Sequence, residues 1–158
     1  MKKIFSYVWP TLLCFAVGFS ASLFQRTSLA EWYPALHKTA LTPPDAVFPV
    51  VWCLLYICIG LSLSLVLVKN VRSGNIVALW CAQLLLNFLW SLFFFYWQNP
   101  LTGMYCIVLL DAVVVLYMMR VYRVRRASMW LFVPYLLWLL LATYMNVYIY
   151  FNNPATLH

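Results

Sequence analysis

Five uninterrupted apolar runs dominate this chain and restrict what it can fold into. They lie near residues 5–24, 46–68, 76–97, 103–121 and 129–151. A helix rises about 1.5 Å per residue, so a run of about 20 residues crosses a hydrocarbon core about 30 Å thick. Only 8% of the residues are charged, far below the roughly 25% of an ordinary soluble domain. We therefore expect one all-α integral membrane domain over residues 1–158, a bundle of five transmembrane helices with a long first loop.

Two other interpretations of the apolar runs are less favoured. Strands of a membrane barrel alternate lipid-facing and lumen-facing residues in shorter segments, whereas these runs are continuously apolar. The first run has features of a secretory signal, because Lys2 and Lys3 precede it and it contains the small residues Ser20, Ala21 and Ser22. It is long for the core of a signal peptide, so we expect it to remain as the first helix.

The basic residues predict an orientation in the membrane. If the chain crosses the membrane five times, two of the ten basic residues, Arg26 and Lys38, fall on one side. The other eight fall on the opposite side: Lys2, Lys3, Lys69, Arg72, Arg120, Arg123, Arg125 and Arg126. The positive-inside rule then places the N-terminus in the cytoplasm and the long loop and C-terminus outside. The same residues attract anionic lipid head groups, and their dispersal over three short segments gives nucleic-acid binding little support.

Cysteine and histidine give little basis for a metal or disulfide site. The five cysteines fall inside the apolar runs with no CxxC spacing, which is typical of small buried hydrophobic residues. The two histidines, His37 and His158, lie outside the runs, so no histidine inside the bundle is placed to ligate a haem. No Ser-His-Asp triad, paired carboxylates or phosphate-binding loop is visible, and we expect neither a metal nor a permanently bound cofactor.

Polar and aromatic residues in three of the spans recur at helical spacing. The faces comprise Pro49, Trp52, Tyr56 and Ile59 in the second span; Gln83, Asn87, Trp90, Ser91 and Phe94 in the third; and Pro134, Trp138, Ala142, Met145 and Asn146 in the fifth. Such spacing places each set on one side of its helix. Hydrogen-bonding groups at membrane depth are costly without partners, so these faces should point inward. They suggest a pocket for a flat, mostly apolar ligand.

Purely structural roles remain open for the same residues. Asn and Gln often join transmembrane helices by hydrogen bonds, and tryptophans form belts at the membrane interface. We assign Trp9, Trp97 and Trp130, near span ends, to such belts, and Trp52 also lies near the start of a span. Asp111 sits in the middle of the fourth span, where an ionisable group indicates either a functional role or a hydrogen-bonded packing carboxyl.

Three motifs in this order resemble the translocator proteins, also called tryptophan-rich sensory proteins or peripheral-type benzodiazepine receptors. The first comprises Trp32, Tyr33, Leu36, Lys38, Pro43, Pro44, Val51, Trp52, Leu55 and Tyr56. The second is AQLLLNFLWS, with Gln83, Leu84, Leu86, Asn87 and Trp90. The third is VPYLLWLLLATYMN, with Pro134, Tyr135, Trp138, Ala142, Thr143 and Asn146, and Asp111 matches the fourth-helix aspartate of the family. The resemblance covers nearly the whole chain.

The resemblance implies that the first loop acts as a lid over a pocket inside the bundle. Its implied ligands are porphyrins, such as protoporphyrin IX, together with isoquinoline carboxamides and benzodiazepines. The implied ligand-binding residues are Tyr33, Trp52, Asn87, Trp90, Ser91, Trp138 and Ala142, and the further functional candidates are Gln83, Asp111 and Asn146. Some bacterial members are linked to light- and oxygen-dependent degradation of protoporphyrin IX, which implies tentative catalytic roles for Trp52 and Trp138. A sensor or transporter without chemistry, and a structural membrane protein, are the alternatives.

Departures from the family pattern refine these expectations. Thr39 follows the lid lysine where the family usually has proline, which predicts a looser lid. A sterol-contact pattern found in animal members is broken at Val147 and Phe151, so we do not expect cholesterol transport. That departure and the basic clusters favour a bacterial plasma membrane. We also expect a homodimer, with helix contacts at either of two pairs of small residues, Ala78 with Ala82 or Gly18 with Ser22, each of which could equally be an internal contact.

Overall fold

Helices account for most of residues 2–69 and 74–154, the part of the chain that the computed structural model describes. They are α1 (Lys2–Ala30), the short α2 (Trp32–Ala35), α3 (Val47–Leu67), α4 (Gly74–Ser91), the π-helical turn η1 (Leu92–Tyr96), α5 (Pro100–Val124) and α6 (Arg126–Asn152). Within the described residues, five helices are long and apolar enough to cross a membrane. The predicted all-α fold and its five spans are thereby confirmed.

The first span ends later than the sequence predicted. Its helix continues beyond residue 24 to Ala30, because Gln25 at this end finds a partner inside the protein. The Gln25 side-chain amide donates to the Ser91 hydroxyl at 2.9 Å, and Ser28 is buried. What remains of the long loop is α2 and residues 36–46, together called the lid below.

Helix boundaries follow from local chemistry at two further places. Asn99 caps α5, with its side-chain oxygen accepting the Thr102 backbone N–H at 3.0 Å, and Pro100 occupies the first turn, where its missing N–H costs nothing. The start of α3 is fixed by a turn in which the Val47 N–H donates to the Pro44 carbonyl at 2.9 Å. Pro49 follows within the first turn of α3, which a proline tolerates.

The long helices pack side by side around a shared apolar core. Helix α3 packs on α1 and α6, α5 packs on α4 and α6, and α4 also meets α1. The contact between α1 and α3 is close enough to require glycine, since a Cβ added to Gly60 would lie 2.5 Å from the Thr11 Cα. The large side chains buried most completely in this core include Trp80, Tyr117, Phe132 and Tyr135.

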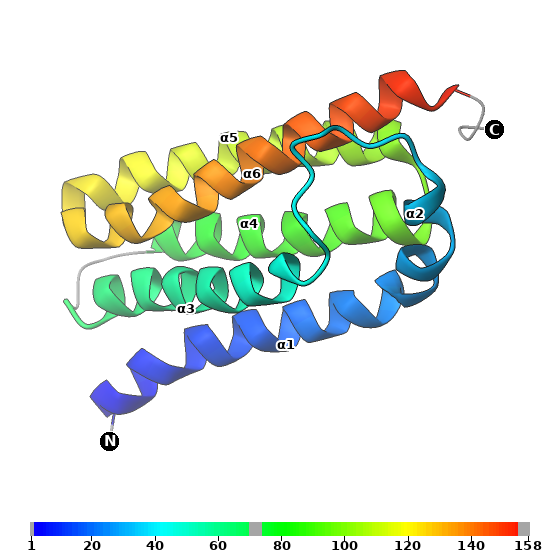
Figure 1. The fold of residues 1–158 in the computed structure, drawn as a ribbon. Helices are drawn as coiled ribbons and strands as arrows, with labels where there is room; N and C mark the ends of the chain where they lie inside the picture. The colour runs from blue at the N-terminus through cyan, green and yellow to red at the C-terminus, as the bar shows by residue number, and fades with distance from the viewer. Residues whose placement is uncertain (1, 70–73, 155–158) are drawn as a thin grey trace.

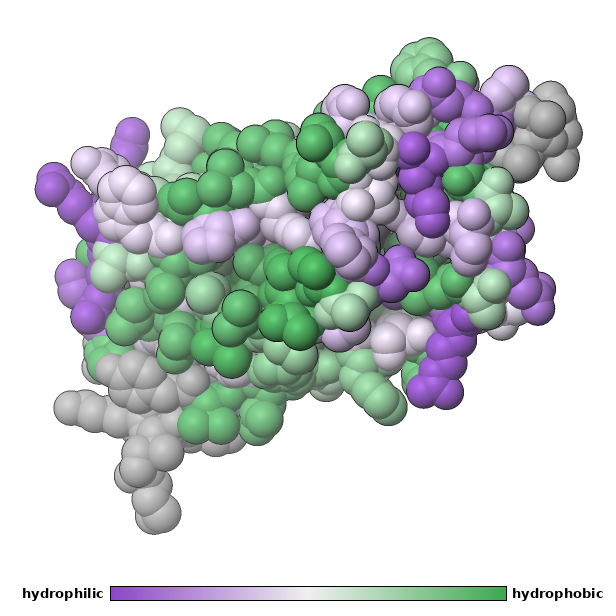
Figure 2. All heavy atoms as spheres, viewed as in Figure 1, coloured by the Kyte–Doolittle hydropathy of each residue, from purple (hydrophilic) through white to green (hydrophobic). Residues whose placement is uncertain are grey.

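The two ends of the bundle carry different segments. The start of α1 and the connection between α5 and α6 lie at one end, and α2, the lid loop and the end of α6 lie at the other (Figure 1). Figure 2 shows an apolar belt over the middle of the visible face, with hydrophilic residues gathered toward both ends. This arrangement matches a bundle that spans a bilayer and presents the lid at one membrane surface.

Candidate functional site

Trp90 on α4 is held in place by the start of α5 and the end of α6. Its indole N–H donates to the side-chain oxygen of Asn146 at 3.0 Å, and the Asn146 amide donates to the Pro100 carbonyl at 2.8 Å. Gly103 makes room for this pair, because a Cβ there would lie 3.0 Å from the Asn146 oxygen. Asn146, predicted as a functional candidate, is therefore placed to orient the Trp90 ring.

A second polar contact lies deeper in the bundle. The Asn87 amide donates to the Tyr135 hydroxyl at 3.2 Å, and Tyr135 has no exposed surface. The Tyr135 ring also meets Trp52, with ring centroids 6.4 Å apart, and Trp52 lies 5.3 Å from Tyr56. The structure thus joins the predicted inward faces of the second, third and fifth spans through Tyr135.

Phe48 connects the remaining aromatic candidates, although it was not among the predicted site residues. Its ring meets Trp138 edge-on, with centroids 5.5 Å apart, and it packs with Trp90 against the buried cluster that includes Ala142. Phe48 lies one helical turn before Trp52, so the spacing that indicated Trp52 also applied to Phe48. Phe48 lies close to the predicted start of the span, and the helical spacing was therefore not extended back to it.

The lid packs over the same end of the aromatic group. Tyr33 is buried with Leu36, Phe94 and Ile149, and Trp90 packs against that cluster. Burial, followed by the negative charge of Asp45, raises the pKa of the Tyr33 hydroxyl above its ordinary value of 10.0. Trp90 therefore lies between the lid and the residues around Ala142.

Hydrogen bonds join the lid to the end of α6. The His37 N–H donates to the Asn153 side-chain oxygen at 2.8 Å, and the Asn153 amide donates to the His37 carbonyl at 3.1 Å. The same amide also donates to the Ile149 carbonyl at 2.9 Å. The lid is further held by a 3.4 Å contact from the Thr39 hydroxyl to Tyr144, and the Lys38 ammonium lies 4.6 Å above the Tyr33 ring.

Three predicted candidates have partners or positions apart from this aromatic group. Ser91 is buried and accepts from Gln25 on α1. Asp111 accepts from the Thr143 hydroxyl at 2.8 Å across the contact between α5 and α6, and it is half-buried. Gln83 is fully buried, and its amide atoms have no hydrogen-bond partner among the described residues.

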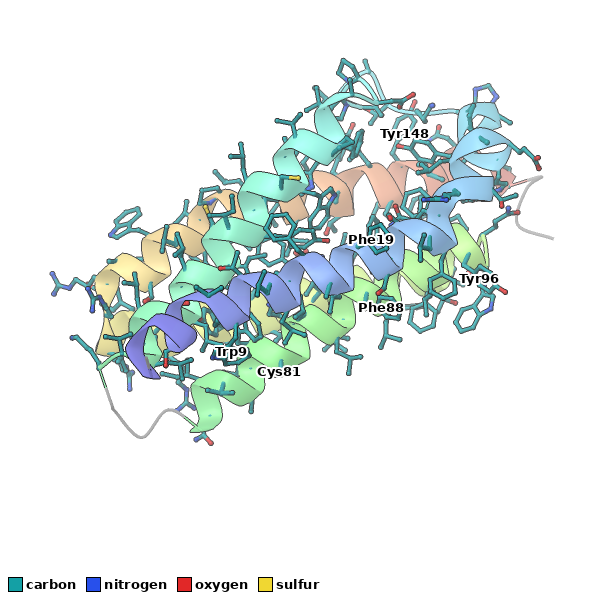
Figure 3. The ribbon with its side chains drawn as sticks, turned by 90° about the horizontal axis from the view of Figure 1, so that it is seen from below. Trp9, Phe19, Cys81, Phe88, Tyr96 and Tyr148 are labelled. Carbon is teal, nitrogen blue, oxygen red and sulfur yellow. The ribbon has the colours of Figure 1, made fainter. Side chains whose placement is uncertain are left out.

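An open groove of about 420 Å³ runs between α1 and α4, away from the aromatic group. Figure 3 shows Phe88 and Cys81 along α4 where it lies beside α1. The groove is lined by Leu13, Ala16, Val17, Ser20, Trp80, Cys81, Leu84, Leu85 and Phe88. The aromatic side chains under the lid, in contrast, pack against one another.

The described residues contain no group of three or more His, Cys, Asp or Glu that could hold a metal ion. The polar side chains at the aromatic group are indoles, phenols and amides. These side chains can stack on a flat ring system and offer it hydrogen bonds. They do not form an acid-base pair suited to hydrolysis.

Comparisons with known proteins show which family this sequence resembles. Residues 10–151 match the model of the TspO/MBR family. The chain is 41% identical over 156 residues to the tryptophan-rich protein TspO of Chlorobaculum tepidum, covering 97% of this chain and 99% of that protein. It is 38% identical over 152 residues to the tryptophan-rich protein TspO of Archaeoglobus fulgidus, covering 96% and 99%. A tryptophan-rich sensory protein of Cereibacter sphaeroides is 31% identical over 140 residues, covering 87% and 88%.

The matches extend over the lid, the aromatic faces and all five spans. This integral membrane protein belongs to the TspO/MBR family.

Proposed function

We propose that this membrane protein binds a porphyrin, with protoporphyrin IX as the representative ligand, between the lid and the aromatic faces of the bundle. The observation that supports this most is the series of aromatic contacts that begins at Tyr33 of the lid and continues through Trp90 and Phe48 to Trp138. Indole rings present flat apolar surfaces on which a macrocycle stacks. Flat synthetic ligands of the isoquinoline carboxamide and benzodiazepine types suit the same surfaces.

The bound porphyrin is also proposed to be degraded in light and oxygen. An excited porphyrin transfers an electron to molecular oxygen without any acid, base or metal from the protein. Superoxide then adds to the oxidised porphyrin, so that both oxygen atoms enter the macrocycle and open it. The indoles of Trp138 and Trp52, in direct contact with the ligand, exchange an electron reversibly with the porphyrin during this step and are unchanged at its end. Protoporphyrin IX is thus substrate, and oxygen is the oxidant.

The test uses absorbance and fluorescence of protoporphyrin IX mixed with detergent-purified protein, in the dark and under light. The variant is Trp138→Phe, and the matched control is Trp130→Phe on the same helix, where the ring is 64% exposed. A product band that grows only in light, survives Trp130→Phe and disappears with Trp138→Phe supports degradation. A saturable spectral shift without product restricts the protein to binding and removes the catalytic assignment.

A sensory role without chemistry is the second candidate, and the name of the Cereibacter sphaeroides relative favours it. In that case the ligand stays unchanged, and the position of the lid reports its presence. A purely structural protein differs from both, since it shows no saturable binding and tolerates Trp138→Phe and Asn87→Leu. Titration of those two variants with protoporphyrin IX in the dark separates the structural role from the binding roles.

The proposed setting is a bacterial plasma membrane, with the N-terminus in the cytoplasm and the lid outside. The bias of the basic residues supports this orientation, and alkaline phosphatase fused after residue 154 tests it, being active only outside the cytoplasm. A homodimer through Ala78 and Ala82 is also proposed. Ala78 is exposed on α4, whereas Gly18 faces inward, where a Cβ would meet the Tyr56 ring. Crosslinking through Ala78→Cys, with Ala112→Cys on the exposed face of α5 as control, tests the dimer.

A further inference from the structure

We infer that Asn153 is a positioning residue that latches the lid closed, and that opening this latch controls ligand exchange. The side chain bonds both main-chain polar groups of His37, at 2.8 and 3.1 Å. It does so from a buried position, with only 5% of the residue exposed. One side-chain amide thus pairs with one residue of the loop in the way that neighbouring strands pair through their backbones.

The position of Asn153 couples the lid to the end of a membrane-spanning helix. Asn153 follows the last residue of α6, and its amide also donates to the carbonyl of Ile149, one turn earlier. Carbonyls in the last turn of a helix lack partners within the helix. The same amide therefore caps α6 and holds the loop, so unwinding of the last turn and release of the lid occur together.

Other hydrogen bonds of the loop are weaker or local. The Thr39 hydroxyl reaches Tyr144 at 3.4 Å, which is longer than the usual range for hydroxyl donors. The Thr42 N–H donates to the Thr39 carbonyl at 3.0 Å within the loop itself. Among the hydrogen bonds described for residues 36–46, the pair at Asn153 is the strongest link to another part of the bundle.

Release of the latch matters because the aromatic side chains beneath the lid are in contact with one another. Tyr33, one short stretch before His37 in the lid, packs in the same cluster as Trp90, and Trp90 contacts the cluster that includes Ala142. A flat ligand reaches these rings from the lid end only when the loop moves. This gating step rests on the proposed porphyrin site, whereas the latch itself does not.

Trypsin provides a direct test of the latch without any ligand. Lys38 is the one lysine or arginine between Arg26 and Lys69, and the next residue is Thr39 rather than proline, so the bond is a substrate for trypsin. Thr39 is buried in the closed lid, which protects the bond until the loop opens. Cleavage yields residues 1–38 and 39–158, and its rate at low trypsin concentration measures how often the lid opens.

The test variant is Asn153→Ala, and two controls match it. His37→Ala keeps the main-chain groups that the latch uses, and Asn152→Ala removes a neighbouring amide that bonds only the Tyr148 carbonyl of its own helix. Loss of the latch is expected to speed cleavage about tenfold or more, while both controls stay within about twofold of the wild type. Each rate is normalised to cleavage of the matching peptide covering residues 32–44.

A second variant, Asn153→Asp, separates loss of the latch from a folding defect in the alanine variant. It has nearly the same shape and keeps an oxygen for the His37 N–H, but it turns the donor toward two carbonyls into an acceptor. Fast cleavage in both Asn153 variants, with wild-type helix content by circular dichroism, supports the latch. Cleavage of either folded variant at the wild-type rate overturns it.

Stopped-flow mixing with protoporphyrin IX then tests the gate. Asn153→Ala is expected to raise the association and dissociation rates by similar factors, because the latch is released before both steps. Faster proteolysis with unchanged porphyrin rates overturns the gate and leaves the latch standing. Absence of saturable porphyrin binding to the wild type and all variants overturns both the proposed function and the gate. The trypsin experiment still shows whether Asn153 holds the lid closed.

Discussion

The pair formed by Trp90 and Asn146 makes a quantitative prediction about how the site is held together. Asn146→Leu keeps the size of the side chain but removes its bonds to the Trp90 indole and the Pro100 carbonyl. The indole N–H is then left without its partner, which costs about 1 to 3 kcal/mol. Trp90→Phe in the same background removes that orphaned donor. The double variant should therefore lose less stability than the two single variants added together.

The expected coupling between the two positions is about 0.6 to 1.7 kcal/mol, the range that hydrogen bonds between membrane helices show. The assay is reversible unfolding of the detergent-solubilised protein in increasing sodium dodecyl sulfate, followed by circular dichroism, for all four members of the cycle. Trp90→Phe with Asn87→Leu provides the control cycle, since Asn87 bonds Tyr135 rather than Trp90. Strict additivity at Trp90 and Asn146 would refute the orienting role of Asn146.

Three shorter predictions concern packing and charge. Gly60→Ala should destabilise the protein by about 1 to 3 kcal/mol, measured by the same unfolding assay, because the added methyl group meets the Thr11 backbone; unchanged stability contradicts the close helix contact. Asp111→Asn should cost less than about 1 kcal/mol, since an amide oxygen can still accept the threonine hydroxyl; a larger loss indicates a need for the carboxyl itself. The raised pKa of Tyr33 means that the lid loses stability only as pH rises above 10.0, the unperturbed value, so trypsin cleavage at Lys38, normalised to the peptide, should be constant from about pH 7 to 9. A rise in cleavage within that range contradicts the assignment.

Hydropathy was sufficient to predict the five spans, because the cost of placing backbone and charge in lipid leaves few alternatives to long apolar helices. It failed at the end of α1, where Gln25 and Ser28 are polar and yet continue the helix. The partner of Gln25 is Ser91, which lies elsewhere in the bundle, and Ser28 is buried. Local sequence carries no sign of such a partner.

The candidate site was predictable in part for the same reason. Helical spacing placed Asn87, Trp90 and Asn146 on inward faces, and all three make hydrogen bonds inside the bundle. Spacing did not indicate which of them bond to one another, because that depends on how the helices cross. The contact between His37 and Asn153 lay further out of reach, since it joins positions 116 residues apart through main-chain atoms.

The outer position of α1 has a consequence for how the protein is made. Little of α1 is buried in the bundle, and it is the least apolar of the five spans. It is nevertheless synthesised first, and its main partner α3 is complete only once Leu67 has been added. The hydroxyls of Ser20 and Ser22 bond to carbonyls of their own helix. Newly made α1 can therefore lie in lipid with the hydroxyls of Ser20 and Ser22 already hydrogen-bonded. Gln25 forms its bond to Ser91 only after α4 has been inserted.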